Sequence, residues 1–169
     1  MRKAQIAGQI FIYIIAVVVV GFIIVYGYSA IKGFSDKESQ VEFITLKTNV
    51  ENSFKSIISD YGSIKRPDLD VPGRFRMLCF VDKTKAAASA TTDLCREGGA
   101  DGLYEPVVCA TWSLGRDNVF LVPDGSVSWD VGDIILNDGD AFLCLPVVNN
   151  KVKLQLKSLG DKVRVSTYD

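Results

Sequence analysis

The stretch Ala4–Ile31, AQIAGQIFIYIIAVVVVGFIIVYGYSAI, contains no charged residue, and its centre is apolar almost without a break. About 20 such residues, each adding about 1.5 Å of helix, cross the hydrocarbon core of a bilayer. The run Val17–Val20 favours a strand in water. In lipid, however, a single strand leaves its backbone N–H and C=O groups unpaired, whereas a helix pairs them internally. The sequence therefore predicts a transmembrane helix over residues 9–31, with membrane lipid around it.

The charges before and after this stretch predict its orientation. Arg2 and Lys3 precede it, and the first acidic residue of the chain is Asp36. Because positively charged flanks stay in the cytoplasm, we expect residues 1–8 there and the residues after 31 on the other side of the cell membrane. A cleaved secretory signal is the alternative. It is less favoured, because the apolar run is long for a signal peptide and 28–30 is a poor cleavage site.

Two short motifs place a small residue and a glutamine at the start of the apolar helix. The first is Arg2, Lys3, Ala4 and Gln5, and the second is Ala7, Gly8 and Gln9. This start resembles the class III signal of type IV pilin-like proteins, especially archaeal ones. The resemblance implies cleavage after Ala4 or Gly8, which would make residues 1–8 or part of them a leader. It covers the first third of the chain, and the early glutamate of many bacterial pilins is absent.

The charge balance beyond the apolar stretch excludes some partners. The chain has 169 residues, with 19 Lys plus Arg and 20 Asp plus Glu. Without Arg2 and Lys3, 17 basic residues remain against 20 acidic ones. The outer part therefore lacks the basic excess that nucleic acid or anionic lipid attracts, and we expect no nucleic-acid partner. It is long enough for one domain with its own core.

Four cysteines lie in the predicted outer part. An even number of cysteines outside the cytoplasm favours disulfides, and we expect at least one. Four cysteines permit three pairings, and buried free thiols are the alternative. A zinc site is disfavoured, because the chain has no CxxC spacing and no histidine. The disulfide candidates are Cys79, Cys95, Cys109 and Cys144.

A second, amphipathic helix is predicted over residues 35–62, after a joint at residues 31–34. Ser35 and Glu38 have the spacing of a capping box, and Gly62 is a stop signal. Apolar residues follow at intervals of three and four and form one stripe. We expect this stripe to pack on the outer domain, with a coiled coil to a neighbouring subunit as the alternative. The stripe consists of Phe43, Leu46, Val50, Phe54, Ile57, Ile58 and Tyr61.

From residue 71 onwards the apolar period changes to two, which predicts an extracytoplasmic, antiparallel β-rich domain over residues 71–169. The expected fold class is therefore α+β, a long N-terminal helix packed on a β-rich head. Residues 83–102 are expected to form a long outer loop, and residues 103–112, which contain Pro106, an edge strand or irregular segment. The expected strands are residues 74–81, 118–122, 126–129, 133–136, 141–148, 151–157 and 162–167.

No convincing catalytic site emerges. A chain without histidine has no Ser-His-Asp triad, and no phosphate-binding or dinucleotide-binding motif is present. Residues 137–140 with Asp133 offer oxygens for Ca²⁺, but they lack EF-hand spacing, so a turn is favoured. We assign no catalytic, cofactor-binding or metal-binding residue. Four aromatic residues could line a sugar or peptide groove, although core positions are favoured; they are Tyr104, Trp112, Phe120 and Trp129.

These features together predict a non-enzymatic, single-pass surface protein. The resemblance implies a filament subunit with a structural or adhesive role, which contacts copies of itself through the apolar helix. Ala16, Gly21 and Gly27 would allow such helices to approach closely. The alternative is a monomeric membrane-anchored domain that binds a ligand or partner outside the cell. An anchored hydrolase is the least favoured class, because its motifs are absent.

Overall fold

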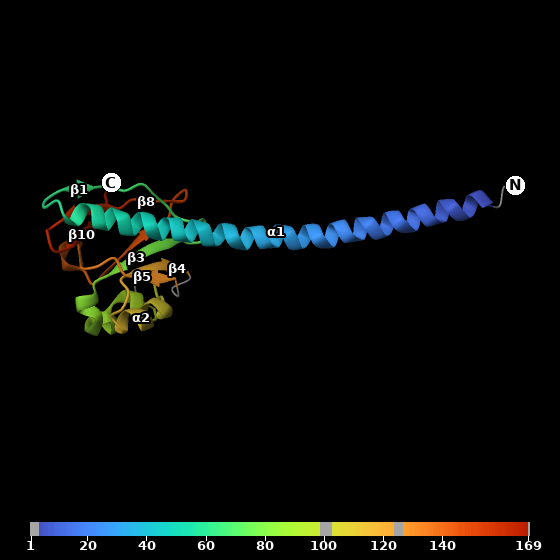
Figure 1. The fold of residues 1–169 in the computed structure, drawn as a ribbon. Coiled ribbons are helices and arrows are strands. Elements are labelled where there is room, and N and C mark those ends of the chain that lie inside the picture. Colours follow the sequence, from blue (N-terminus) through green and yellow to red (C-terminus); the bar gives the residue numbers. More distant parts are fainter. Residues whose placement is uncertain (1–3, 99–102, 124–126, 169) are drawn as a thin grey trace. The chain divides into compact units, whose positions relative to one another are not determined.

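A computed structural model describes residues 4–98, 103–123 and 127–168 of the chain (Figure 1). The chain divides into two compact units, Met1–Val41 and Glu42–Asp169. Helix α1 (Ala4–Ile58) contributes to both units. The expected joint at residues 31–34 is wrong, because α1 is helical throughout this segment. A single Gly33 costs only about 1 kcal/mol of helix propensity, which is too little to break a helix that continues for many residues before and after it.

The C-terminal end of α1 also differs from the prediction. The helix ends at Ile58, and residues 59–62 form turns in which Gly62 has a φ of 82°. Tyr61 is therefore outside the helix and 79% exposed, so it does not continue the apolar stripe. Ser35 lies inside α1, where its backbone cannot be the N-cap of a second helix.

The second unit is rich in β-structure, which confirms the predicted α+β class in its coarse form. One four-stranded sheet has the order β5-β4-β3-β7, another has the order β1-β9-β10-β6, and β2 pairs with β8. The pairing is antiparallel except between β6 and β10, where it is parallel. The elements are β1 (Ile64–Lys65), β2 (Leu69–Asp70), β3 (Met77–Val81), η1 (Lys83–Thr91), η2 (Asp93–Cys95), α2 (Pro106–Ser113), β4 (Val119–Val122), β5 (Ser128–Trp129), β6 (Ile134–Leu136), η3 (Asn137–Gly139), β7 (Phe142–Pro146), β8 (Lys151–Val152), β9 (Gln155–Ser158) and β10 (Val163–Ser166).

Strand β3 separates two hydrophobic clusters of this unit. Leu78 and Phe80 belong to the larger cluster, whereas the alternate residues Cys79 and Val81 belong to the smaller one. This division follows from the strand geometry, which sends successive side chains to opposite faces. In Figure 1, α2 lies on the side of the strands opposite the last turns of α1. The larger cluster also contains Leu46, Val50, Phe54 and Ile57 from α1.

Residues 103–112 do not form the expected edge strand or irregular segment. Pro106 instead begins α2, where its missing N–H costs nothing because the first helical N–H groups have no partner within the helix. Val108 and Trp112, four residues apart, are both buried in the smaller cluster. The apolar residues of this segment therefore follow a helical period, which the proline obscures in the sequence.

The expected strand at residues 151–157 is divided into two. Its alternation is confirmed, since Val152, Leu154 and Leu156 are buried. However, β8 pairs with β2, whereas β9 pairs with β1 and β10. A hairpin turn at residues 149–150 leads into β8, with positive φ angles of 52° and 60° and paired backbone hydrogen bonds between residues 148 and 151.

Within residues 83–102, η1 and η2 replace part of the expected loop, while residues 99–102 lie outside the described residues. Residues 124–126 also lie outside the described residues.

Substitution of Phe54 tests the contribution of α1 to the larger cluster. Phe54 is 2% exposed, and its ring stacks on Phe80 with 6.1 Å between centroids. We expect Phe54→Ala to lower the free energy of unfolding by about 3–5 kcal/mol, because it opens a cavity in the core. Urea denaturation of the full chain in detergent, followed by near-ultraviolet circular dichroism, measures this change.

The matched control is Ile44→Ala on the same helix. Ile44 is 60% exposed, so its removal should change the free energy of unfolding by less than about 0.5 kcal/mol. Equal effects of the two substitutions would contradict a specific role of Phe54 in the core.

Candidate functional site

The segment Ile10–Ile31 of α1 is the first candidate for a functional surface. It comprises 22 residues, and none of its side chains is buried within the chain. Its length of about 33 Å matches the hydrocarbon core of a bilayer. By length and composition it could cross a membrane, although a signal sequence near an N-terminus has the same properties. The finding agrees with the predicted transmembrane helix in this coarse form.

None of the small residues predicted for helix packing is buried on this segment, and Gly27 is the half-buried one among them. Ala16 is exposed, and a Cβ atom added at Gly21 or Gly27 would meet no atom within 4 Å. These positions are therefore open to contacts from outside the first unit. The processing candidates Ala4, Gln5, Gly8 and Gln9 lie in α1, but their side chains are not described. The orientation residues Arg2 and Lys3 fall outside the described residues.

All four cysteines form disulfides, which confirms the expectation of at least one. Cys79 and Cys144 lie directly opposite each other on β3 and β7, with 4.0 Å between their Cα atoms. The flanking pairs, Arg76 with Val147 and Asp82 with Ala141, are joined by backbone hydrogen bonds. The cysteines therefore occupy a non-hydrogen-bonded pair, where antiparallel strands bring their Cα atoms closest. This disulfide fastens β7, an edge strand of the β5-β4-β3-β7 sheet, to β3.

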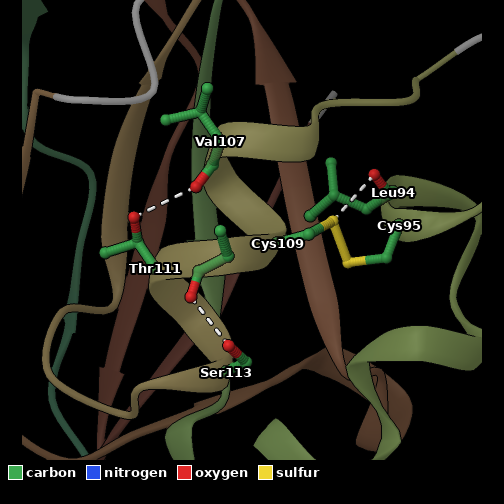
Figure 2. The surroundings of a disulfide bond; sticks show 7 residues. Leu94, Cys95, Val107, Cys109, Thr111 and Ser113 are labelled. Atoms are coloured by element: carbon green, nitrogen blue, oxygen red, sulfur yellow. Dashed lines mark hydrogen bonds between the residues drawn. A yellow bond between two sulfur atoms is a disulfide. The ribbon is translucent and has the colours of Figure 1, made fainter.

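The second disulfide, Cys95–Cys109, joins η2 to α2 (Figure 2). The backbone N–H of Glu105 also donates to the carbonyl of Leu94, 2.9 Å away, so two links hold the segments together. Within α2, the hydroxyls of Thr111 and Ser113 donate to carbonyls of their own helix, as Figure 2 shows. The disulfide therefore fixes η2 and α2 against each other over the smaller cluster. The two hydroxyls already donate hydrogen bonds within α2.

The aromatic residues proposed to line a groove do not do so. Trp112, Phe120 and Trp129 are buried in the two clusters, as the favoured core interpretation predicts. The indole Nε1 of Trp112 donates to the backbone oxygen of Asp82, 3.0 Å away. Tyr104 is the exposed member of the set. The pattern of aromatic residues therefore reflects packing.

The turn at residues 137–140 is confirmed as η3 followed by Asp140. The ammonium group of Lys85 donates to the backbone oxygens of Gly139 and Asp140. A lysine thus occupies carbonyl oxygens that a cation would need. Among the described residues, no three His, Cys, Asp or Glu side chains are grouped closely enough to hold a metal ion.

A surface hollow of about 480 Å³ lies between β7, β8 and the end of β10. Its wall is mainly apolar, with Leu145, Pro146 and Val148, while two lysines stand at it. No short sequence motif marks this hollow, because its segments are far apart in the chain. The lining residues are Leu145, Pro146, Val148, Lys151, Lys153 and Thr167.

The two lysines of the hollow differ in their partners. Lys151 lies 2.7 Å from Asp68 and 2.9 Å from Asp70, measured from Nζ to a carboxylate oxygen. Hydrogen bonds to Asp68 and then Asp70 raise the pKa of Lys151 above its ordinary value. Lys153 has no carboxylate within 4.0 Å among the described residues, and its closest recorded partner is the ring of Tyr168 at 6.0 Å. Of these two lysines, Lys151 alone is therefore neutralised by carboxylates of the described residues.

No family model matches the chain, and no curated protein or solved structure matches it. A functional assignment therefore depends on the residues and their geometry.

The two disulfides should stabilise the second unit by different amounts. Cys79–Cys144 closes a loop with a sequence separation of 65, against 14 for Cys95–Cys109. Because a longer loop restricts the unfolded chain more, we expect a loss of about 4 kcal/mol for Cys79→Ala/Cys144→Ala and about 3 kcal/mol for Cys95→Ala/Cys109→Ala. Urea denaturation of both variants without reductant measures the difference, and the reverse order would contradict the loop-length argument.

Proposed function

We propose that this chain is a single-pass surface protein of the type IV pilin-like kind, with its N-terminus in the cytoplasm and its β-rich unit outside. Its role is structural or adhesive, and the protein catalyses no reaction. The observation that carries the proposal is the segment Ile10–Ile31, which is apolar and helical and has no buried residue. Such a helix needs an apolar environment, which lipid or other copies of the same helix can supply.

The small residues of the segment support assembly over a solitary anchor. Open space around Gly21 and Gly27, together with the exposed Ala16, permits close approach of another backbone. Close approach at small residues is the usual basis of helix association where the surroundings are apolar on both sides. In this proposal, copies of α1 exchange lipid contacts for contacts with one another in a filament core.

The disulfides support the proposed side of the membrane. Two disulfides in one small unit are typical of an oxidising compartment and are rare in the cytoplasm. Because the positive-inside rule keeps Arg2 and Lys3 on the cytoplasmic side, the chain would cross the membrane once.

The later part of α1 would then connect the membrane segment to the β-rich unit. Leu46, Val50, Phe54 and Ile57 recur at intervals of three and four and are buried. Val41 and Ile44 remain exposed, 62% and 60%, and offer an apolar contact to a neighbouring copy. In this proposal α1 is amphipathic in its second half, with one face for its own unit and one for assembly.

A monomeric, membrane-anchored binding domain is the second candidate. The hollow of about 480 Å³ supports it, since its volume lies within the usual range for small-ligand pockets. An apolar wall with a lysine that no described carboxylate neutralises would suit a small apolar ligand with an acidic group. This function requires neither processing of the N-terminus nor self-association.

The mature N-terminus distinguishes the two candidates. We expect mass spectrometry of the protein from native membranes to find a start at Gln5 or Gln9, because the filament proposal requires removal of the basic leader. An intact Met1 would contradict the processed-subunit proposal and favour the anchored binding domain. A start at Tyr28 or Ile31 would show secretion and contradict both.

Substitution of the two glycines tests helix packing directly. We expect Gly21→Leu/Gly27→Leu to abolish filaments on cells viewed by electron microscopy, because the added side chains hold neighbouring helices apart. Membrane insertion should persist, since leucine is apolar.

The control is Ile23→Leu, which conserves side-chain volume at an exposed position between the glycines. Filaments that survive the glycine variant would exclude packing at these positions, and loss of filaments in the control would indicate a non-specific effect.

A further inference from the structure

The outer face of the sheet formed by β1, β9 and β10 has no role in the function proposed above. Along β9 and β10, Leu156, Ser158, Val163 and Val165 are buried, so the alternate residues face outward. We infer that this outward face, called here the basic face, binds a linear acidic polysaccharide through cations that no described carboxylate neutralises. The basic face comprises Arg66, Lys153, Lys157 and Arg164, with Gln155 and Tyr168 between them.

The strand register places these residues on one surface. Lys157 lies opposite Arg164 across β9 and β10, and it also lies opposite Ile64 of β1. Two residues along β9, Gln155 accepts a hydrogen bond of 2.9 Å from Nε of Arg66. These contacts extend the face from β10 to the segment after β1.

The ring of Tyr168 contacts two cations of the basic face, Arg66 and Lys153. The guanidinium carbon of Arg66 lies 4.7 Å from the centroid of the Tyr168 ring, and Nζ of Lys153 lies 6.0 Å from it. An aromatic face attracts cations without neutralising them. Tyr168 therefore gathers two positive charges and leaves their charge available to an anion.

The four cations have no acidic partner in the described part of the chain, where no carboxylate oxygen lies within 4.0 Å of them. The contrast with Lys151 is informative, because two aspartates neutralise that residue. Lys157 and Arg164 are directly opposed like charges, an arrangement that destabilises a sheet in isolation. An anion placed over this pair would remove the repulsion.

The shape of the basic face favours a polymer over a small ion. Residues 153–157, which comprise the start of β9 and the two residues before it, span about 13 Å. Neighbouring strands are about 4.8 Å apart, so the cations are spread over a flat surface. A flat surface holds a single small anion weakly, whereas a chain with repeated carboxylates contacts several cations at once.

The compartment of the second unit determines which polyanions it can meet. This step rests on the proposed extracytoplasmic location. Disulfides place the unit where acidic polysaccharides are the common polyanions, away from the cytoplasmic leaflet with its concentrated anionic lipid. A failure of the location itself would be seen separately, as free thiols in protein taken directly from cells.

The test is binding of fluorescent oligogalacturonate to the full chain in detergent, measured by anisotropy in low salt. We expect saturable binding that weakens as salt rises, with dextran of similar length inactive. Lys157→Gln/Arg164→Gln should weaken binding about tenfold, because it removes the opposed pair of charges. Circular dichroism should show both strands retained, since the two side chains are on the surface.

The matched control is Lys47→Gln/Lys55→Gln, which makes the same change in net charge on α1. These lysines lie on α1 beside Glu51, outside the basic face, so binding should stay within about twofold of the wild type. Equal weakening in both variants would show a net-charge effect and overturn the inference. Binding no better than dextran, or tighter binding to single-stranded DNA or anionic vesicles, would also overturn it.

Discussion

Burial of β3 on both faces is the constraint on which the second unit depends. Leu78 and Phe80 contribute to one hydrophobic cluster, and Cys79 and Val81 contribute to the other. A strand buried on both faces needs a cover on each side. The last turns of α1 belong to one cluster and α2 to the other, while β4 and β7 pair with the two edges of β3. Each covering element thus has its place because β3 is apolar throughout.

The sequence predicted elements whose periodicity is long and uninterrupted. The apolar segment of α1 and the alternation in residues 151–157 were recognised because one physical rule applies to each over many residues. Single glycine and proline residues are weaker evidence for the end of a helix than such periodicity. Gly33 suggested a joint and Pro106 suggested an extended segment, yet both residues lie in helices. Gly33 costs only about 1 kcal/mol of helix propensity, and Pro106 takes the first position of α2, where its missing N–H costs nothing.

Contacts between distant segments could not be predicted from local patterns. The choice among three cysteine pairings depends on β3 lying beside β7, which the spacing of the cysteines does not reveal. Similarly, the alternation over residues 151–157 predicts one continuous strand. In the structure the chain passes from β8 in one sheet to β9 in another within this segment, so the lysines have different neighbours. Lys151 meets two aspartates, and Lys157 meets Arg164.

Charge is the property for which whole-chain reasoning was least informative. A net charge of −1 argues against polyanion binding if charge is spread evenly over the surface. Sheet register distributes it unevenly, because it places Lys157 against Arg164 and leaves the aspartates beside Lys151. Recognition depends on the field near one face, since salt screens charges beyond about 10 Å. An acidic protein can therefore present a basic face, and only the pairing of its strands shows where that face lies.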